Sequence, residues 1–130
     1  MNKISFSSWP SYDAEEVSAV TNVLMSNKVN YWTGKECRKF EEEFAVWSNS
    51  KYSIALANGT VALDLSLMAL NIGIGDEVIV TSRTFIASVS SIVNAGAIPV
   101  FVDVDRSSQN IHSKSILPAI NSNTKAIMCV

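Results

Sequence analysis

From Tyr52 onward, the sequence alternates short apolar runs with stretches whose apolar residues recur at helical spacing. This alternation is typical of parallel strands with helices packed on the sheet. Ligands bind such sheets at the carboxyl ends of the strands. We therefore expect an α/β fold with a mostly parallel sheet and flanking helices. The expected strands are 53–57, 77–81, 98–103 and 126–130, and the expected helices are 60–70, 85–94 and 113–120.

The first 50 residues differ from the rest, since they predict two helices and no strand. Asp13 and Glu16 have the spacing of a capping box, which predicts a helix over 14–26. A second helix is expected over 35–47, with an aromatic face and an acidic face. We interpret the acidic residues 41–43 as a solvated surface. The expected organisation is a helical segment, 1–50, followed by an α/β part, 51–130.

Composition excludes several classes of function. A net charge of -2 and a pI near 5.3 argue against a nucleic-acid partner, because no basic stripe can neutralise phosphates. No apolar run approaches the roughly 20 residues that span a bilayer, and the N-terminus lacks the apolar core of a signal peptide. We expect a cytoplasmic protein with no membrane partner. Cys129 is expected to be buried and reduced, and the spacing of Cys37, Cys129 and His112 is not that of a metal site.

The segment Asn58-Gly59-Thr60 connects an expected strand directly to an expected helix. The first backbone N–H groups of such a helix are unpaired, and with the helix dipole they favour an anion such as phosphate. Asn58 or Thr60 could equally be a plain N-cap, and both interpretations stay open here. Neither a Walker loop nor the dinucleotide fingerprint is present, so a single phosphate fits better than a pyrophosphate.

Two further loops follow expected strands. Phe85 could stack on a planar ligand or pack in the core at the start of its helix. Arg83 could pair with an anion, although we favour a surface position near Asp76 or Glu77. Asp103 and Asp105 resemble a carboxylate pair, but we favour a turn because Asp and Ser residues bond their own backbone in turns.

Six motifs, taken in chain order, resemble the N-terminal part of the DegT/DnrJ/EryC1/StrS family. Members of this family are pyridoxal-phosphate (PLP) dependent aminotransferases that act on nucleotide-linked keto sugars. Each motif is weak by itself, and their order makes the resemblance specific. The matching segments are Trp32-Thr33-Gly34-Lys35 with Phe40-Glu41-Glu42-Glu43-Phe44-Ala45, Asn58-Gly59-Thr60-Val61-Ala62-Leu63, Ile72-Gly73-Ile74-Gly75-Asp76-Glu77-Val78-Ile79-Val80, Thr84-Phe85-Ile86-Ala87-Ser88, Gly96-Ala97-Ile98-Pro99-Val100-Phe101-Val102-Asp103-Val104-Asp105 and Thr124-Lys125-Ala126-Ile127.

The resemblance implies roles for four residues. Gly59 and Thr60 would bind the PLP phosphate, helped by the Val61 N–H, and Phe85 would stack on the pyridine ring. It also implies the fold-type-I aminotransferase large domain, a homodimer, and glutamate as the amino donor for the nucleotide-sugar substrate.

The same resemblance implies that no catalytic residue lies in this chain. The family's Schiff-base lysine, and the aspartate that pairs with the pyridine nitrogen, lie further along than Val130. Because the sequence stops on an apolar strand, we expect the first part of a longer protein, inactive by itself and prone to self-association. The alternatives are a non-catalytic module of the same fold, or part of a PLP-dependent sugar dehydratase.

Overall fold

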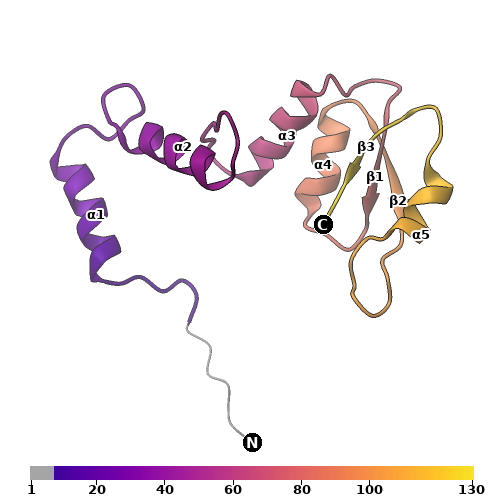
Figure 1. Cartoon of the computed structure of the whole chain (residues 1–130), viewed down its shortest axis with the longest axis horizontal. Helices are drawn as coiled ribbons and strands as arrows, with labels where there is room; N and C mark the ends of the chain where they lie inside the picture. The colour runs from indigo at the N-terminus through magenta and orange to yellow at the C-terminus, as the bar shows by residue number, and fades with distance from the viewer. Residues whose placement is uncertain (1–7) are drawn as a thin grey trace, which may run out of the picture. The chain divides into compact units, whose positions relative to one another are not determined.

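The computed structural model describes residues 8–130, in two compact units, Met1–Ala55 and Leu56–Val130 (Figure 1). We describe each unit by itself. The residues that suggested a cytoplasmic location lie in part outside the described range. Among the described residues, no helix is both long enough and apolar enough to cross a membrane.

The first unit contains helices α1 (Ala14–Met25) and α2 (Glu36–Trp47). The predicted capping box is confirmed: Asp13 Oδ1 accepts from the Glu16 N–H at 3.2 Å, and Glu16 Oε2 accepts from the Asp13 N–H at 2.8 Å. The aromatic face of α2 is also confirmed. Phe44 lies between Phe40 and Trp47, with ring centroids 5.6 and 5.2 Å apart. Neither helix has a buried residue.

The second unit is an α/β layer, and its three strands form one parallel sheet in the order β2-β1-β3. The expected parallel sheet with flanking helices is therefore confirmed. β1 is the central strand, so both of its edges are paired. The elements are α3 (Gly59–Ala69), β1 (Glu77–Thr81), α4 (Ile86–Asn94), β2 (Ile98–Val102), α5 (Ser113–Ile116), the 3-10 turn η1 (Leu117–Ala119) and β3 (Thr124–Met128).

The strand predicted over 53–57 is wrong, because no strand forms there. The apolar composition of this run favours a strand, but a strand also needs a hydrogen-bonded neighbour. The segment has no ladder partner in the described chain, and the backbone N–H of Ala55 bonds instead to the Glu41 side chain at 2.8 Å. An unpaired segment therefore precedes α3.

The helix predicted over 113–120 is also shorter than expected. It ends as α5 at Ile116 and continues only as the 3-10 turn η1. Pro118 lies in that turn, and its missing N–H removes a bond that a continuous α-helix would need. The last strand begins at Thr124 and ends at Met128, two residues earlier at each end than predicted.

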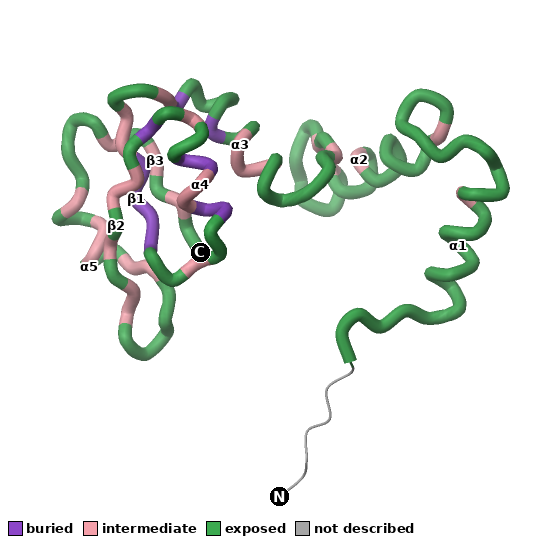
Figure 2. The backbone as a smooth tube through the Cα atoms, turned by 180° about the vertical axis from the view of Figure 1, so that it is seen from behind, coloured by how far each residue is buried: buried purple, intermediate pink, exposed green. Residues whose placement is uncertain are grey.

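The core lies between β1 and the pair of helices α3 and α4, which pack against each other. Figure 2 shows the buried residues in purple, gathered on β1, α4 and the end of α3. Val78, Val80 and Ile92 are fully buried there. Since β1 has neighbours on both edges and covered faces, it is the most protected strand of the unit.

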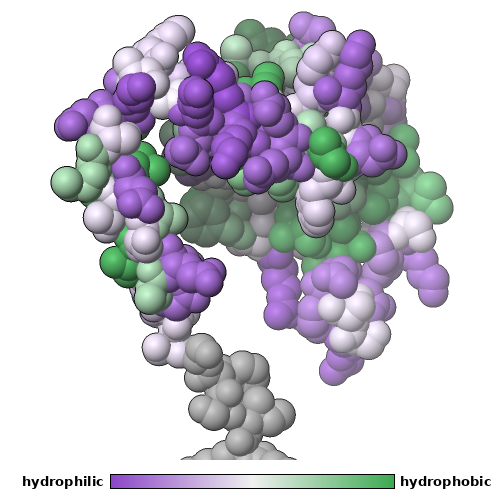
Figure 3. Space-filling view, turned by 60° about the vertical axis from the view of Figure 1, so that its left-hand side comes forward, coloured by the Kyte–Doolittle hydropathy of each residue, from purple (hydrophilic) through white to green (hydrophobic). Residues whose placement is uncertain are grey.

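Two burial predictions are wrong. Helix α3 is apolar almost all round, which predicts burial on several sides, yet only Leu67 is buried. Cys129 is exposed, because it follows β3 rather than lying inside it. Exposed apolar side chains appear in green over the surface in Figure 3. Large apolar faces of this chain therefore have no packing partner within its described units.

Candidate functional site: the first turn of α3

Helices α3 and α4 run opposite to β1, so both begin toward the end of the unit where β1 stops (Figure 1). The segment ahead of α3 carries Asn58-Gly59-Thr60, and the segment ahead of α4 carries Arg83-Thr84-Phe85. This is the edge of a parallel sheet at which ligands are expected. The second unit therefore places the two candidate segments at one end of its sheet.

Asn58 is the N-cap of α3, with extended backbone angles and a side-chain oxygen that accepts from the Val61 N–H at 3.0 Å. The N-cap interpretation is therefore confirmed for Asn58, and the anion site stays a prediction. The N–H groups of Gly59 and Thr60, and the Thr60 hydroxyl, have no hydrogen-bond partner among residues 8–130. Two adjacent amides and one hydroxyl thus remain available at the positive end of the helix.

Gly59 leaves open space at this turn. A Cβ added there would meet no atom within 4 Å, and its backbone does not adopt left-handed angles. Among residues 8–130, neither backbone strain nor a neighbouring atom explains why position 59 is a glycine. A group held against the backbone would explain it, because it would occupy the volume of the missing side chain.

Val61 differs from its two neighbours, because its N–H already donates to Asn58. The three residues expected to bind a phosphate do lie together on the first turn of α3. Only Gly59 and Thr60 present free donors, and an anion would have to displace the Asn58 side chain to reach the third. The sequence left Asn58 open as an N-cap, and the structure shows that its side chain accepts from the Val61 N–H.

Phe85 is the N-cap residue of α4, and its side chain is 73% exposed. The alternative of a core aromatic is wrong for this chain. The loop around it is ordered by side-chain bonds: the hydroxyls of Thr84 and Ser88 lie 2.7 Å apart, and the Arg83 N–H donates to Thr81 Oγ1 at 3.2 Å. Phe85 therefore presents an aromatic ring to the outside from a structured loop.

The surface position of Arg83 is confirmed, but it forms no ion pair with Asp76 or Glu77 in the described chain. Those carboxylates have other partners. Asp76 accepts from the Gly73 N–H at 3.0 Å, and Glu77 accepts from the Asn121 amide at 2.7 Å. Arg83 is thus an exposed cation in the loop ahead of Phe85.

The turn interpretation of Asp103 and Asp105 is confirmed. Asp105 Oδ1 accepts from the Ser107 hydroxyl at 2.6 Å and from the Ser108 N–H at 2.8 Å. These hydrogen bonds, led by that of the Ser107 hydroxyl, hold the pKa of Asp105 well below its usual range. Asp103 accepts from the N–H of Val104. The two carboxylates therefore order the loop in which they lie.

His112 has a local structural role, as its Nδ1 accepts from the Ser115 N–H at 3.3 Å and caps α5. Among residues 8–130, no group of three or more His, Cys, Asp or Glu side chains is placed to hold a metal ion.

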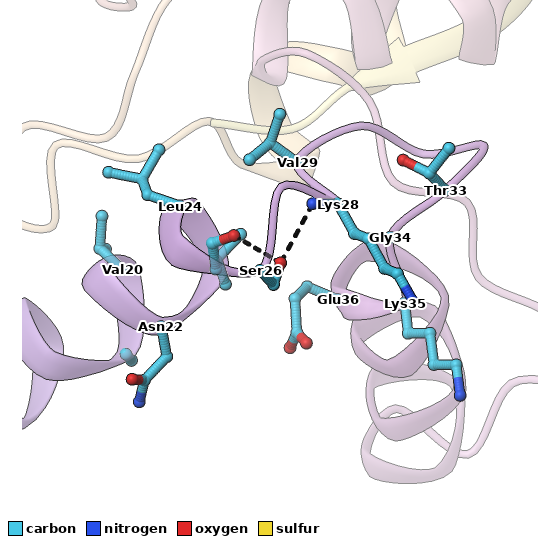
Figure 4. Close-up of a pocket in the computed structure, with 12 residues that line it drawn as sticks. Val20, Asn22, Leu24, Ser26, Lys28, Val29, Thr33, Gly34, Lys35 and Glu36 are labelled. Carbon is cyan, nitrogen blue, oxygen red and sulfur yellow. Dashed lines mark hydrogen bonds between the residues drawn. The ribbon is translucent and has the colours of Figure 1, made fainter.

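A separate open depression of about 780 Å³ lies within the first unit, beside α1 and the loop that follows it. Figure 4 shows Val20, Leu24 and Val29 along it, together with polar side chains such as Asn22 and Glu36. None of Gly59, Thr60, Val61 and Phe85 lines it. The depression is therefore distinct from the first turn of α3.

Sequence reasoning missed Glu41, which belongs to an acidic triplet interpreted as a solvated face. Glu41 is half-buried and accepts hydrogen bonds from Tyr31 Oη at 3.1 Å and from the Ala55 N–H at 2.8 Å. The only signal in the sequence was its place next to Phe40, on the boundary of the aromatic face.

Comparison with known proteins gives consistent matches along the chain. Residues 10–130 match the model of the DegT/DnrJ/EryC1/StrS aminotransferase family. GDP-perosamine synthase of Escherichia coli O157:H7 is 43% identical over 121 residues, which cover 93% of this chain and 33% of that enzyme.

Solved structures also match this chain over most of its length. An aminotransferase from Psychrobacter cryohalolentis is 61% identical, with a TM-score of 0.91 over 96% of this chain and 32% of its own. A Streptococcus pneumoniae protein assigned as a sugar aminotransferase, in its PMP form, is 32% identical, with a TM-score of 0.82 over 97% of this chain and 31% of its own. The chain thus spans about a third of the length of these relatives.

Proposed function

Because this chain belongs to the DegT/DnrJ/EryC1/StrS aminotransferase family, we propose that it is the N-terminal part of a PLP-dependent aminotransferase. The full protein would transfer an amino group from glutamate to a nucleotide-linked keto sugar. The observation that carries the proposal is the coincidence of the family match with two free amides and a free hydroxyl at the first turn of α3. The name of the E. coli relative, GDP-perosamine synthase, supports a nucleotide-sugar substrate.

PLP, when bound, supplies an electron sink that lets an amino group pass between two carbon skeletons. The residues of this chain would bind and orient it. The amides of Gly59 and Thr60 and the Thr60 hydroxyl would donate to the phosphate, and the open space at Gly59 would admit it. Phe85 would stack its exposed ring on the pyridine. The Val61 N–H would join only where Asn58 releases it.

Chemistry on the amino group needs a lysine, and the segments 58–61 and 83–85 contain none. Lys51, which precedes the segment leading to α3, has its Nζ 5.1 Å from the centroid of the Tyr52 ring. We therefore propose that the 130-residue chain binds the phosphate group but does not transaminate. The full protein would be a cytoplasmic homodimer. Treatment of the chain with stoichiometric PLP and borohydride should label no single lysine in preference to the others, as seen by mass spectrometry.

The phosphate site is tested by replacing the Thr60 hydroxyl. Titration of the ¹⁵N-labelled chain with inorganic phosphate should shift the amide resonances of Gly59 and Thr60. T60V should weaken the affinity by roughly 2- to 10-fold, since one hydrogen bond contributes about 0.5–1.5 kcal/mol.

S66A is the matched control. It removes a hydroxyl from the same helix, and that hydroxyl donates to the Ala62 carbonyl at 2.7 Å, away from the first turn. S66A should bind phosphate as the wild-type chain does. Equal affinities for wild type and T60V, or shifts spread over lysine-rich surfaces instead of the first turn, would refute the site.

A further inference from the structure

Glu41 has a different environment from the two glutamates that follow it. Its two carboxylate oxygens accept from different segments: Oε1 from the Ala55 N–H at 2.8 Å, and Oε2 from the Tyr31 hydroxyl at 3.1 Å. Glu42 and Glu43 are exposed and accept no hydrogen bond from residues 8–130. One side chain of α2 thus joins the loop before the helix to the segment after it.

The loop before α2 has a fixed shape of its own. Asn30 Oδ1 accepts from the N–H groups of Trp32 and Thr33, both at 3.0 Å, and the Asn30 carbonyl accepts from the Gly34 N–H at 2.7 Å. A Cβ at Gly34 would lie 2.5 Å from the Lys28 carbonyl oxygen. A side chain at position 34 would clash with this backbone oxygen, so the shape of the loop requires glycine there.

Tyr31 links that loop to α2. Its hydroxyl donates to Glu41, and its ring lies 4.9 Å below the Arg38 guanidinium. The Tyr31 ring also meets Trp32 edge to face, with centroids 6.2 Å apart. Glu41 and Arg38 therefore orient Tyr31 from two successive turns of the helix, and Tyr31 supports Trp32.

The segment after α2 has little else to hold it. Residues 53–57 form no strand, and the bond from Ala55 to Glu41 is the one side-chain bond made by their backbone in the described chain. Ala55 lies three residues before Asn58, the N-cap of α3. Ala55, the last residue of the first unit, is thus held by Glu41 of the same unit.

We propose that Glu41 is a positioning residue, whose carboxylate fixes both the loop 30–34 and the segment that leads into the first turn of α3. Its role in ligand binding rests on the proposed function, and its role in fixing Ala55 does not. Removal of the carboxylate would free the Ala55 amide and widen the range of conformations open to the segment that precedes α3.

Amide hydrogen exchange of the full 130-residue chain tests the proposal. E41A should raise the exchange rate of the Ala55 amide at least about 10-fold, because hydrogen bonds to charged acceptors are among the strongest in proteins. E41Q keeps an oxygen that can accept this bond, so it should restore much of the protection. Y31F should leave Ala55 protected and increase exchange in the loop 30–34 only.

E42Q is the matched control and should change neither segment. The amides within α2 report folding in every variant, so a loss confined to Ala55 is local. A phosphate titration supplies the second measurement: E41A should weaken the response of the Gly59 and Thr60 amides by roughly 2- to 5-fold.

Unchanged Ala55 exchange in E41A would overturn the proposal. Faster exchange of the Ala55 amide in E41A, together with an unchanged phosphate affinity, would overturn the positioning role. The bond between Glu41 and Ala55 would then be a local contact only. A wild-type chain that shows no phosphate response at Gly59 and Thr60 would refute the proposed function, while the Ala55 comparison would still decide the role of Glu41.

Discussion

At the residue scale, Asn58 has two competing tasks. Its side-chain oxygen caps α3 by accepting from the backbone N–H of Val61. That N–H is also the third donor, after those of Gly59 and Thr60, that a phosphate at this turn could use. The cap leaves two amides free, which limits the number of donors for an anion. In the absence of a ligand, the Asn58 side chain stabilises the start of α3 and occupies the Val61 N–H, which then cannot donate to an anion.

Replacing Asn58 with alanine separates the two tasks. N58A should lower the free energy of unfolding of the second unit by about 1 kcal/mol, the usual effect of losing an N-cap side chain. It should also release the Val61 amide, which would then join Gly59 and Thr60 in responding to phosphate. Urea unfolding measures the first effect, and ¹⁵N resonances measure the second. A stable N58A chain whose Val61 amide ignores phosphate would contradict both.

The role of Thr60 in holding a phosphate stays a prediction. A hydroxyl after a glycine suits a phosphate, and the Thr60 hydroxyl has no hydrogen-bond partner among residues 8–130. Apart from its place next to Phe40, nothing local in the sequence distinguishes Glu41 from the two glutamates that follow it. Its partners, Tyr31 and Ala55, lie 10 and 14 positions away, and only the folded chain brings them together.

At the element scale, the end of α4 is set by a glycine. Gly96 has a φ of +80°, its N–H donates to the Val93 carbonyl at 2.9 Å, and the Ala97 N–H donates to the Ile92 carbonyl at 3.1 Å. This pair of bonds is the Schellman motif, which ends α4 at a glycine. It turns the chain from α4 into β2.

G96A should lower the free energy of unfolding by about 1–2 kcal/mol, because a side chain strains left-handed backbone. The new Cβ would also lie 3.1 Å from Ile74 Cγ1. The matched control is G73A, whose Cβ would meet only ordinary contact at 3.6 Å and whose φ is not left-handed. Thermal or urea unfolding should distinguish the two variants. A G96A chain as stable as G73A would show that the cap does not limit stability.

Elements were predictable where local signals agreed. The strand 77–81 and the capping box at Asp13 came out as predicted, because β-branched runs and capping residues act within a few positions. The segment 53–57 failed for the opposite reason. Its composition suits a strand, but strand formation was decided by the pairing of β1 with β2 and β3.

At the scale of the whole molecule, the chain exposes much apolar surface. On α3, Leu65 is 41% exposed and Met68 is 63% exposed, and on the edge strand β2, Phe101 is 55% exposed. Contiguous exposed apolar surface and open sheet edges promote association. We therefore expect this chain to self-associate.

M68K should reduce that association, because it places a charge on the exposed apolar face of α3. Sedimentation velocity over a range of concentrations should show a smaller average mass for M68K than for the wild-type chain. S66K adds the same charge to the same helix at an exposed polar position, and it should have less effect. A wild-type chain that sediments as a monomer at every concentration would contradict the expectation.

The sequence by itself determined the local chemistry of this protein: the parallel α/β pattern, the helix caps, and the glycine and hydroxyl at the start of α3. These features depend on residues a few positions apart, so their physics can be worked out along the chain. Tertiary structure alone decided which amides stay free, which glutamate is bound on both oxygens, and that 53–57 remains unpaired. Those outcomes depend on partners brought together by folding, and pairing between distant residues leaves no periodic trace in a single sequence.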